Sequence, residues 1–188
     1  MSVVIITPPE AVDLLVEAKA KIIVEHDDDD AYLTSLVNVA LAMIDGPFGR
    51  LGRCIREQTL EASFDGFGCR PLLWLPYPPF INLVSVTYDD PDGVETTLNT
   101  SVCGLKQDRG LYRKDGQGWP ATRRGGYDTV RVRYTAGYPE GLPAPVQEAV
   151  LGLVAQWYAV REPVTDKPLH EVPFTVSDQL APYVMPVV

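Results

Sequence analysis

The apolar residues of this chain change their spacing twice, and no other feature constrains the fold as strongly. Near both ends they recur every three or four residues, which is the spacing of an amphipathic helix. In the middle they alternate with polar residues, as in a half-buried strand. A pattern with one period cannot bury its apolar face in the other structure. The sequence therefore predicts an α+β protein in which a β-region is inserted between helical ends.

Apolar stripes predict three helices, at residues 11–22, 33–44 and 146–158. The first has two candidate starts, a capping pattern at residues 7–10 and a later cap at Asp13. The second ends where glycine and proline interrupt the stripe, and the third follows prolines that suit a first helical turn. Trp157 and Tyr158 close the third stripe, and we interpret them as core residues or interface anchors.

The middle of the chain predicts a small antiparallel sheet or barrel. It contains a β-prone segment, an acidic turn with proline and glycine, and a second strand, at residues 83–88, 89–93 and 94–98. A further strand at residues 129–134 alternates cleanly. Because successive side chains of a strand point to opposite faces, we expect Val130, Val132 and Tyr134 to face a core.

Four arginines lie within eleven residues of this β-region, namely Arg123, Arg124, Arg131 and Arg133. As a basic patch they could contact the phosphates of a nucleic acid. Alternatively, they lie on a solvated strand face and are balanced by nearby acidic residues. Aromatic residues of the kind that stack on single-stranded nucleic acid are sparse here, so we favour the second interpretation.

Charge is distributed unevenly along the chain, whose net charge is −9. Residues 1–50 carry nine acidic and three basic side chains, residues 51–142 carry eleven of each, and residues 143–188 carry five and two. Tight sequence-independent binding of nucleic acid depends on Lys and Arg that neutralise phosphates. The acidic balance therefore disfavours a protein that holds DNA.

An acidic run, Asp27–Asp30 preceded by His26, is the most conspicuous local feature. Clustered carboxylates suit a divalent cation, but the alternating acids and later glutamate of a calcium-binding loop are absent. We favour the interpretation that Asp28 or Asp29 caps the following helix while the neighbouring acids favour its positive end.

Several classes of protein are disfavoured by what the sequence lacks. It contains no apolar run of about 18–20 residues, so we expect no membrane span. The N-terminus has neither the basic flank nor the cleavage site of a secretory signal, and three cysteines without a CxxC pair indicate a reducing compartment. Phosphate-loop, dinucleotide, nucleophile-elbow and zinc-protease motifs are missing. We therefore expect no enzyme and neither a cofactor nor a metal.

The last segment, residues 164–188, is interrupted by prolines yet rich in apolar residues. A disordered solvated tail would be polar, so an extended segment that docks on another surface explains this composition better. The candidate docking residues are Phe174, Leu180, Pro182, Tyr183, Val184 and Met185.

These patterns together predict a helical bundle from the N- and C-terminal helices with an inserted antiparallel β-lobe and an extended C-terminal tail. The expected boundaries are residues 1–50 for the N-terminal helices, 51–138 for the β-lobe, 139–163 for the C-terminal helix and 164–188 for the tail. The C-terminal helix is expected to pack on the N-terminal helices.

Two motifs in the middle of the chain suggest a family. The segment LWLPYPPF at residues 73–80, followed by VSVTYDDPDG at residues 84–93, resembles a hallmark of the head–tail connector proteins of tailed phages, prophages and gene transfer agents. Further segments agree with that family in order, at residues 17–19, 27–33, 119–120, 134–138, 143–161 and 180–183.

The resemblance implies a structural protein of the virion neck, made in the host cytoplasm. Such connectors form a ring, commonly of twelve copies, beneath the portal protein of a filled capsid. The ring extends the DNA channel without specific DNA binding, receives the next neck or tail-completion protein, and docks its C-terminal tail on the portal. The alternative is a binding module whose arginine-bearing β-lobe contacts nucleic acid or a host factor.

Overall fold

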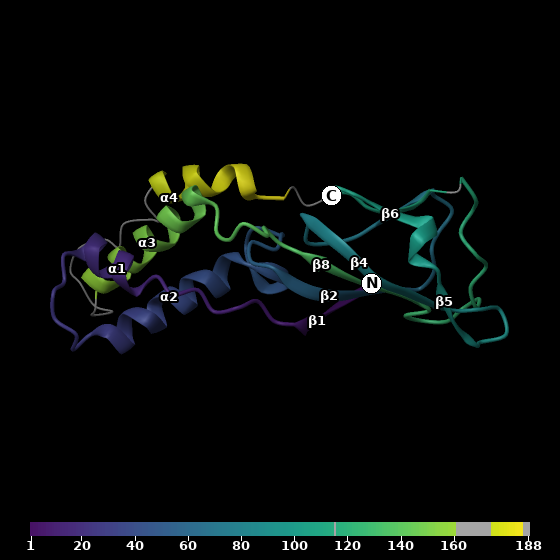
Figure 1. Cartoon of the computed structure of the whole chain (residues 1–188), viewed down its shortest axis with the longest axis horizontal. Coiled ribbons are helices and arrows are strands. Elements are labelled where there is room, and N and C mark those ends of the chain that lie inside the picture. The colour runs from purple at the N-terminus through teal and green to yellow at the C-terminus, as the bar shows by residue number, and fades with distance from the viewer. Residues whose placement is uncertain (115, 161–173, 186–188) are drawn as a thin grey trace. The chain divides into compact units, whose positions relative to one another are not determined.

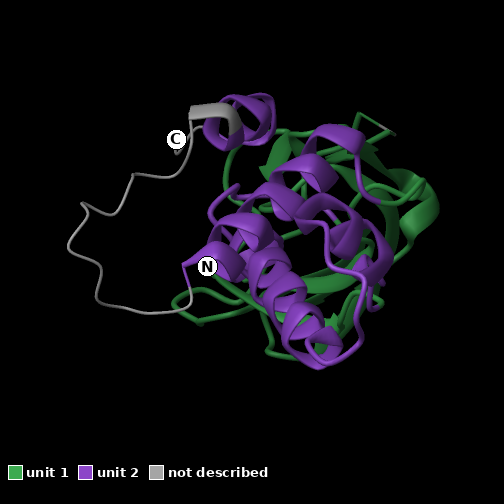
Figure 2. Ribbon diagram, turned by 90° about the vertical axis from the view of Figure 1, so that its left-hand side faces the viewer, with its two compact units in different colours: residues 1–10, 56–141 green, residues 11–55, 142–188 purple. Residues whose placement is uncertain are grey.

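A computed structural model describes residues 1–114, 116–160 and 174–185 of the chain (Figure 1). The chain divides into two compact units, each made from two separate stretches of sequence (Figure 2). Unit 1 comprises Met1–Glu10 and Arg56–Gly141, and unit 2 comprises Ala11–Ile55 and Leu142–Val188. Helices and antiparallel strands are both present, which confirms the α+β class.

Unit 1 contains a five-stranded antiparallel sheet with the strand order β1-β2-β8-β4-β5. Its strands are β1 (Ser2–Thr7), β2 (Gln58–Phe64), β4 (Phe80–Asp89), β5 (Glu95–Leu98) and β8 (Val130–Ala136). The central strand β8 pairs with β2 on one side and β4 on the other. Val130, Val132 and Tyr134 are fully buried while Arg131 and Arg133 are not, which confirms the predicted alternation.

The hairpin between β4 and β5 forms at the predicted turn. Asp90 Oδ1 accepts hydrogen bonds from the backbone N–H groups of Asp92 (3.0 Å) and Val94 (2.9 Å). Gly93 follows with φ at 83°, a left-handed conformation that glycine adopts without steric cost. The aspartate side chain and the glycine backbone therefore explain why this acidic segment turns.

A three-stranded antiparallel sheet with the order β3-β7-β6 completes unit 1. It consists of β3 (Leu72–Trp74), β6 (Cys103–Lys106) and β7 (Gly110–Arg113), with a 3₁₀ turn at Thr100–Val102 before β6. Gly110 has φ at 141°, and a Cβ atom there would lie 2.1 Å from the carbonyl oxygen of Leu73. Strands β3 and β7 can approach this closely only because residue 110 has no side chain.

The proline-rich motif before β4 is tied to the core of unit 1. The buried Tyr134 hydroxyl donates a hydrogen bond to the carbonyl oxygen of Pro76 (2.7 Å), and its ring meets Phe80 edge to face at 5.4 Å. The hydrogen bond gives the Pro76 carbonyl oxygen a partner, and the ring contact packs Phe80 against the core. The motif that carries the family resemblance is therefore structural in this unit.

Strand β1 lies within residues 1–50, the segment assigned above to the N-terminal helices, where no strand was predicted. Residues 2–7 pair with β2 in antiparallel register, from Ser2 opposite Ser63 to Thr7 opposite Thr59. Their β-branched side chains suit a strand, but the partner lies more than fifty residues away in sequence. Six residues are too few to distinguish a helical period from a strand period, so the structure of this segment depends on its pairing with β2.

Unit 2 contains the helices α1 (Leu15–Ile22), α2 (Asp30–Ile44), α3 (Ala144–Ala159) and α4 (Phe174–Leu180), with 3₁₀ turns at Gly46–Phe48 and Ala181–Tyr183. Helix α3 contacts α1, α2 and α4 and buries Val146, Val150 and Val154 completely. The three predicted helices are confirmed. Of the two candidate starts of α1 the later one is correct, because α1 begins at Leu15. Asp13 lies one residue before the N-cap position, Leu14, and its Oδ1 accepts the N–H of Leu15 at 3.0 Å.

Helix α4 corrects the prediction of an extended tail over residues 164–188. Residues 174–183 are helical, and Val176 is only 4% exposed. A Cβ atom on Gly152 of α3 would lie 3.3 Å from Cγ2 of Val176, so the two helices touch at a glycine. Pro182 lies in the first turn of the 3₁₀ helix, where a missing N–H costs nothing. Residues 164–173 and 186–188 lie outside the described part.

Candidate assembly surfaces

The predicted docking residues lie on α4, on the 3₁₀ turn and immediately after it. Pro182 and Val184 are exposed, the latter by 49%, whereas Leu180, Tyr183 and Met185 are half-buried. Phe174 begins α4, and its side chain lies outside the described part. The structure therefore divides the predicted set into residues that face outward and residues held within unit 2.

Met185 belongs to the second group because two hydrogen bonds hold it on the loop after α2. Its backbone N–H donates to the carbonyl oxygen of Leu51 (2.8 Å), and Arg53 Nη2 donates to its sulfur (3.1 Å). A Cβ atom on Gly52 would lie 3.4 Å from the Met185 Cβ. The chain between Val176 and Met185 is thus fixed at both ends, and the exposed Pro182 and Val184 lie between these fixed points.

Trp157 and Tyr158 lie on the last turn of α3, and both are half-buried. The Tyr158 hydroxyl donates a hydrogen bond to Asp29 Oδ2 (2.5 Å), and its ring lies 6.3 Å from that of Tyr32 on α2. Tyr158 therefore connects α3 to the start of α2 inside unit 2. Trp157 stays a predicted interface residue.

Replacing Tyr158 by phenylalanine should lower the free energy of unfolding by about 1–2 kcal/mol, because hydrogen bonds to charged groups contribute that much or slightly more. Urea denaturation of the purified chain measures the change. Tyr127, which is 88% exposed in unit 1, provides the control, since Tyr127→Phe should leave the transition unchanged. Equal effects of the two substitutions would contradict the role of the Tyr158 hydroxyl.

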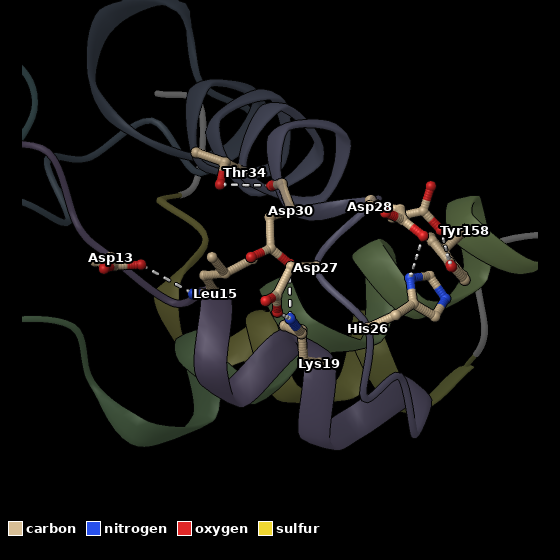
Figure 3. A network of polar contacts seen from close by, with 10 residues as sticks. Asp13, Leu15, Lys19, His26, Asp27, Asp28, Asp30, Thr34 and Tyr158 are labelled. Carbon is tan, nitrogen blue, oxygen red and sulfur yellow. Dashed lines mark hydrogen bonds and ion pairs between the residues drawn. The ribbon is translucent and has the colours of Figure 1, made fainter.

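The acidic run leads into α2, whose first residue is Asp30, and one lysine binds two of its carboxylates (Figure 3). Lys19 Nζ of α1 donates to Asp27 Oδ1 (2.6 Å) and Asp30 Oδ1 (2.7 Å). Asp29 occupies the N-cap position of α2, but its side chain makes no capping hydrogen bond and accepts from Tyr158 instead. Asp28 is 96% exposed and lies 3.9 Å from His26 Nδ1. The predicted side-chain cap by Asp28 or Asp29 is therefore wrong, because the Asp29 carboxylate binds the Tyr158 hydroxyl and the Asp28 carboxylate is exposed to solvent.

The ion pairs of Lys19 raise the pKa of the lysine and lower the pKa of Asp27. The hydrogen bond with Asp27, followed by that with Asp30, raises the pKa of Lys19 above its ordinary 10.5. The hydrogen bond from Lys19 lowers the pKa of Asp27 below its ordinary 3.8. Both charged forms are therefore favoured by folding, so these pairs stabilise unit 2 between about pH 4 and about pH 10.5.

Replacing Lys19 by methionine should remove this pH dependence. The contribution of Asp27 is complete above pH 3.8 and is lost as the pH falls through its lowered pKa. The contribution of Lys19 is complete below pH 10.5 and is lost as the pH rises through its raised pKa. The difference in urea midpoint between wild type and Lys19→Met should be largest near pH 7 and shrink towards both limits. A difference that is the same at all pH values would contradict this account.

The four arginines of the predicted basic patch separate into two pairs with different surroundings. Arg131 Nη2 contacts Asp89 (2.8 Å) and Glu95 (2.6 Å). Arg133 Nη2 contacts Glu61 (2.8 Å). The hydrogen bond with Asp89 raises the pKa of Arg131, so its charge is satisfied within unit 1. Arg123 and Arg124 are exposed on the loop before β8, so no continuous patch of four free guanidinium groups forms.

The cysteines and the side chains that could bind a metal do not form a site within the described residues. Cys54 and Cys103 are buried, Cys69 is exposed, and none of these three residues forms a disulfide. Burial raises the pKa of Cys54. In the part of the chain that the structure describes, no three His, Cys, Asp or Glu side chains gather as metal ligands would. None of the helices within residues 1–114, 116–160 and 174–185 is long and apolar enough to cross a membrane.

Comparison with known proteins finds similar structures but no similar sequence family. No family model and no curated protein matches the chain. Among the solved structures that match is a chain in the neck of an empty gene transfer agent (GTA) particle computed with C6 symmetry. It has a TM-score of 0.78 and 23% identity, over 100% of this chain and 97% of that one.

Two further structures agree over the same shares of both chains. One is from the virion of a native GTA particle, with a TM-score of 0.77 and 22% identity. The other is from the neck of a native GTA particle computed with C12 symmetry, with a TM-score of 0.74 and 23% identity. This chain therefore has a fold found in gene transfer agent particles, one of the classes to which its sequence motifs point.

Proposed function

We propose that this protein is a structural component of a virion neck that joins the capsid to the tail. The supporting observation is the similarity of fold to a chain of a GTA neck, which extends over 100% of this chain and 97% of that chain. The motifs at residues 73–80 and 84–93 resemble those of head–tail connectors and also support the proposal. The protein acts in this role without catalysis and without a cofactor.

Within the neck, the protein forms a ring beneath the portal protein and extends the DNA channel. A neck that contains a similar chain was computed with C12 symmetry, which supports a ring of twelve copies. Identical subunits in a closed ring meet through two different surface patches, so each copy must present complementary faces to its neighbours. The next neck or tail-completion protein binds the finished ring.

DNA passes this ring without being held. The net charge is −9, and the guanidinium groups of Arg131 and Arg133 already contact carboxylates of unit 1. Neutralisation of phosphates by Lys and Arg supplies most of the sequence-independent affinity for DNA. Because acidic side chains outnumber basic ones, the net charge of the subunit opposes retention of the duplex in the channel.

The C-terminal segment contacts the portal protein through its outward residues. Pro182 and Val184 are exposed between the fixed points at Val176 and Met185, so they present a short apolar surface on a defined backbone. Leu180 and Tyr183 border this surface and are half-buried. Before assembly the subunit resides in the host cytoplasm.

Imaging of the particle neck at side-chain resolution tests this proposal. The producing strain should yield particles with a ring of twelve copies of this chain between portal and tail. Deletion of the gene should leave filled capsids without tails, and a plasmid copy should restore joined particles. Tailed particles produced at the normal number without the gene would overturn the proposal.

A further inference from the structure

Phe48 is an aromatic side chain in unit 2 that is almost fully exposed. It ends the 3₁₀ turn Gly46–Phe48 that follows α2, and 87% of it is accessible. Burying a phenylalanine side chain contributes roughly 1.5–3 kcal/mol, so a partner that covers Phe48 would gain this stabilisation on binding. Aromatic residues are enriched in protein interfaces.

The backbone that presents Phe48 is fixed on both sides. The carboxylate of Asp45, itself 7% exposed, accepts the N–H of Ile55 at 2.7 Å. The N–H of Gly46 donates to the carbonyl oxygen of Arg53 (3.0 Å), and that of Arg50 donates to Met43 (2.8 Å). A side chain on such a rigid turn loses little conformational entropy when it binds.

Glycine at position 49 is required by this geometry. A Cβ atom there would lie 2.4 Å from the backbone nitrogen of Asp45 and 2.4 Å from the carbonyl carbon of Ile44. The turn therefore packs directly against the end of α2. The direction in which Phe48 projects is set by that packing.

Arg50, two residues after Phe48, adds a free positive charge. Its side chain is exposed and makes no ion pair within the described residues. By contrast, Lys19 and Lys21 of the same unit contact carboxylates, and Arg53 contacts the sulfur of Met185. Phenylalanine and arginine are both enriched in protein interfaces.

A pocket elsewhere on unit 2 matches Phe48 and Arg50 in size and charge. It has a volume of about 270 Å³ and lies between the segment before α1 and the middle of α2. Its lining includes the buried Leu14 and Val37, the half-buried Leu15, and the exposed Thr34 and Asn38. A cavity of about 150 Å³ accommodates benzene, so a benzyl group fits here.

The rim of this pocket carries an exposed acid. Asp13 is one of its lining residues, and its carboxylate accepts the N–H of Leu15 at the start of α1 (Figure 3). That single hydrogen bond leaves further lone pairs of the carboxylate for a guanidinium group. The pocket is thus an apolar cavity with a negative charge at its edge.

We propose that Phe48 of one copy of this chain inserts into this pocket of the next copy, and that Arg50 pairs with Asp13 there. A copy does not fill its own pocket, because Phe48 follows the C-terminal end of α2 while the pocket opens at the middle of that rigid helix. Two different patches on one compact unit make a heterologous contact, the type of contact that a closed ring of identical subunits requires. This inference rests on the proposed ring and identifies the surfaces that form it.

Photo-cross-linking in assembled particles tests the contact. The residue p-benzoylphenylalanine is placed at position 48 of the full chain in the producing strain, and purified particles are irradiated. Denaturing gels should show an adduct of two copies, and its peptides should join position 48 to residues 11–15 or 34–38. An adduct that joins position 48 to other residues, or no adduct in particles that contain the ring, would overturn the inference. Particles that contain no ring of this chain would instead overturn the proposed function.

Substitutions provide a second readout in the same particles. Phe48→Ala and Asn38→Trp, which fills the pocket from an exposed position, should each reduce joined particles about tenfold or more. Arg50→Glu should have a smaller effect, and Arg50→Lys should retain most of the wild-type number. The matched controls are Tyr127→Ala, equally exposed in unit 1, and Ser35→Trp, exposed on α2 but outside the pocket lining. Equal losses from Phe48→Ala and Tyr127→Ala would overturn the inference.

Discussion

Replacing Val184 by aspartate should stop capsids from joining tails while the protein remains folded. Val184 is 49% exposed, so a carboxylate there costs the isolated subunit little. On the proposed portal-facing surface the same carboxylate would be buried without a partner, at a cost of several kcal/mol. Since about 1.4 kcal/mol corresponds to a tenfold change in binding, joined particles should fall about a hundredfold or more. Electron microscopy of particles from the producing strain gives the count.

Ser177→Asp provides the control for Val184→Asp, because residue 177 is exposed on α4 and receives the same charge. It should leave the number of joined particles within about twofold of wild type. Removal of the whole chain from Pro168 onward is a less specific test. It also deletes Val176 and Met185, whose contacts with Gly152 and Leu51 stabilise unit 2. Wild-type numbers of joined particles with Val184→Asp would refute the docking role of this segment.

Replacing Gly110 by alanine should destabilise unit 1 strongly, and more than replacing Gly116 by alanine. The residue has φ at 141°, and the new Cβ would lie 2.1 Å from the carbonyl oxygen of Leu73 and 2.8 Å from the backbone nitrogen of Leu75. Backbone strain of this kind costs about 1–3 kcal/mol, and overpacking adds about 1–3 kcal/mol. We expect a loss of about 3 kcal/mol or more in urea denaturation. Tryptophan fluorescence reports the transition, and Trp74, which pairs with Gly110, is one of the three tryptophans that contribute to it.

Gly116→Ala separates the two costs. Gly116 also has a positive φ, of 68°, but no heavy atom lies within 4 Å of the added Cβ. Its substitution should therefore cost only the backbone strain, about 1 kcal/mol. If both substitutions shift the urea midpoint equally, the close approach of β3 and β7 at Gly110 is not the reason for glycine there.

The elements that were predicted correctly are those whose determinants lie close together in sequence. The stripe that forms α3 repeats within its own turns, and the β4–β5 hairpin depends on Asp90 and Gly93, which act on neighbouring backbone groups. Strand β1 and helix α4 depend on distant partners instead. The first needs β2, and the second needs Gly152 of α3, so local periodicity did not reveal either.

The candidate sites show the same division. Composition indicated that the C-terminal segment docks on a surface, but it treated Val184 and Met185 alike. The structure separates them, because Met185 is hydrogen-bonded to Leu51 while Val184 is exposed. Phe48 was not singled out by its sequence pattern, since a phenylalanine after a helix is as compatible with a core as with a surface. Only its exposure and the packing of Gly49 distinguish it.

By itself, the sequence determined the α+β class, the positions of three helices and one hairpin, and an acidic balance of −9. These follow from local period, turn chemistry and composition. The tertiary structure decided which charged side chains bind one another. It paired Lys19 with Asp27 and Asp30, directed Asp29 to Tyr158 in place of a helix cap, and neutralised Arg131 and Arg133 with carboxylates of neighbouring strands. The physical reason is that an ion pair or hydrogen bond is set by distances of about 3 Å in space, between residues that can be far apart in sequence.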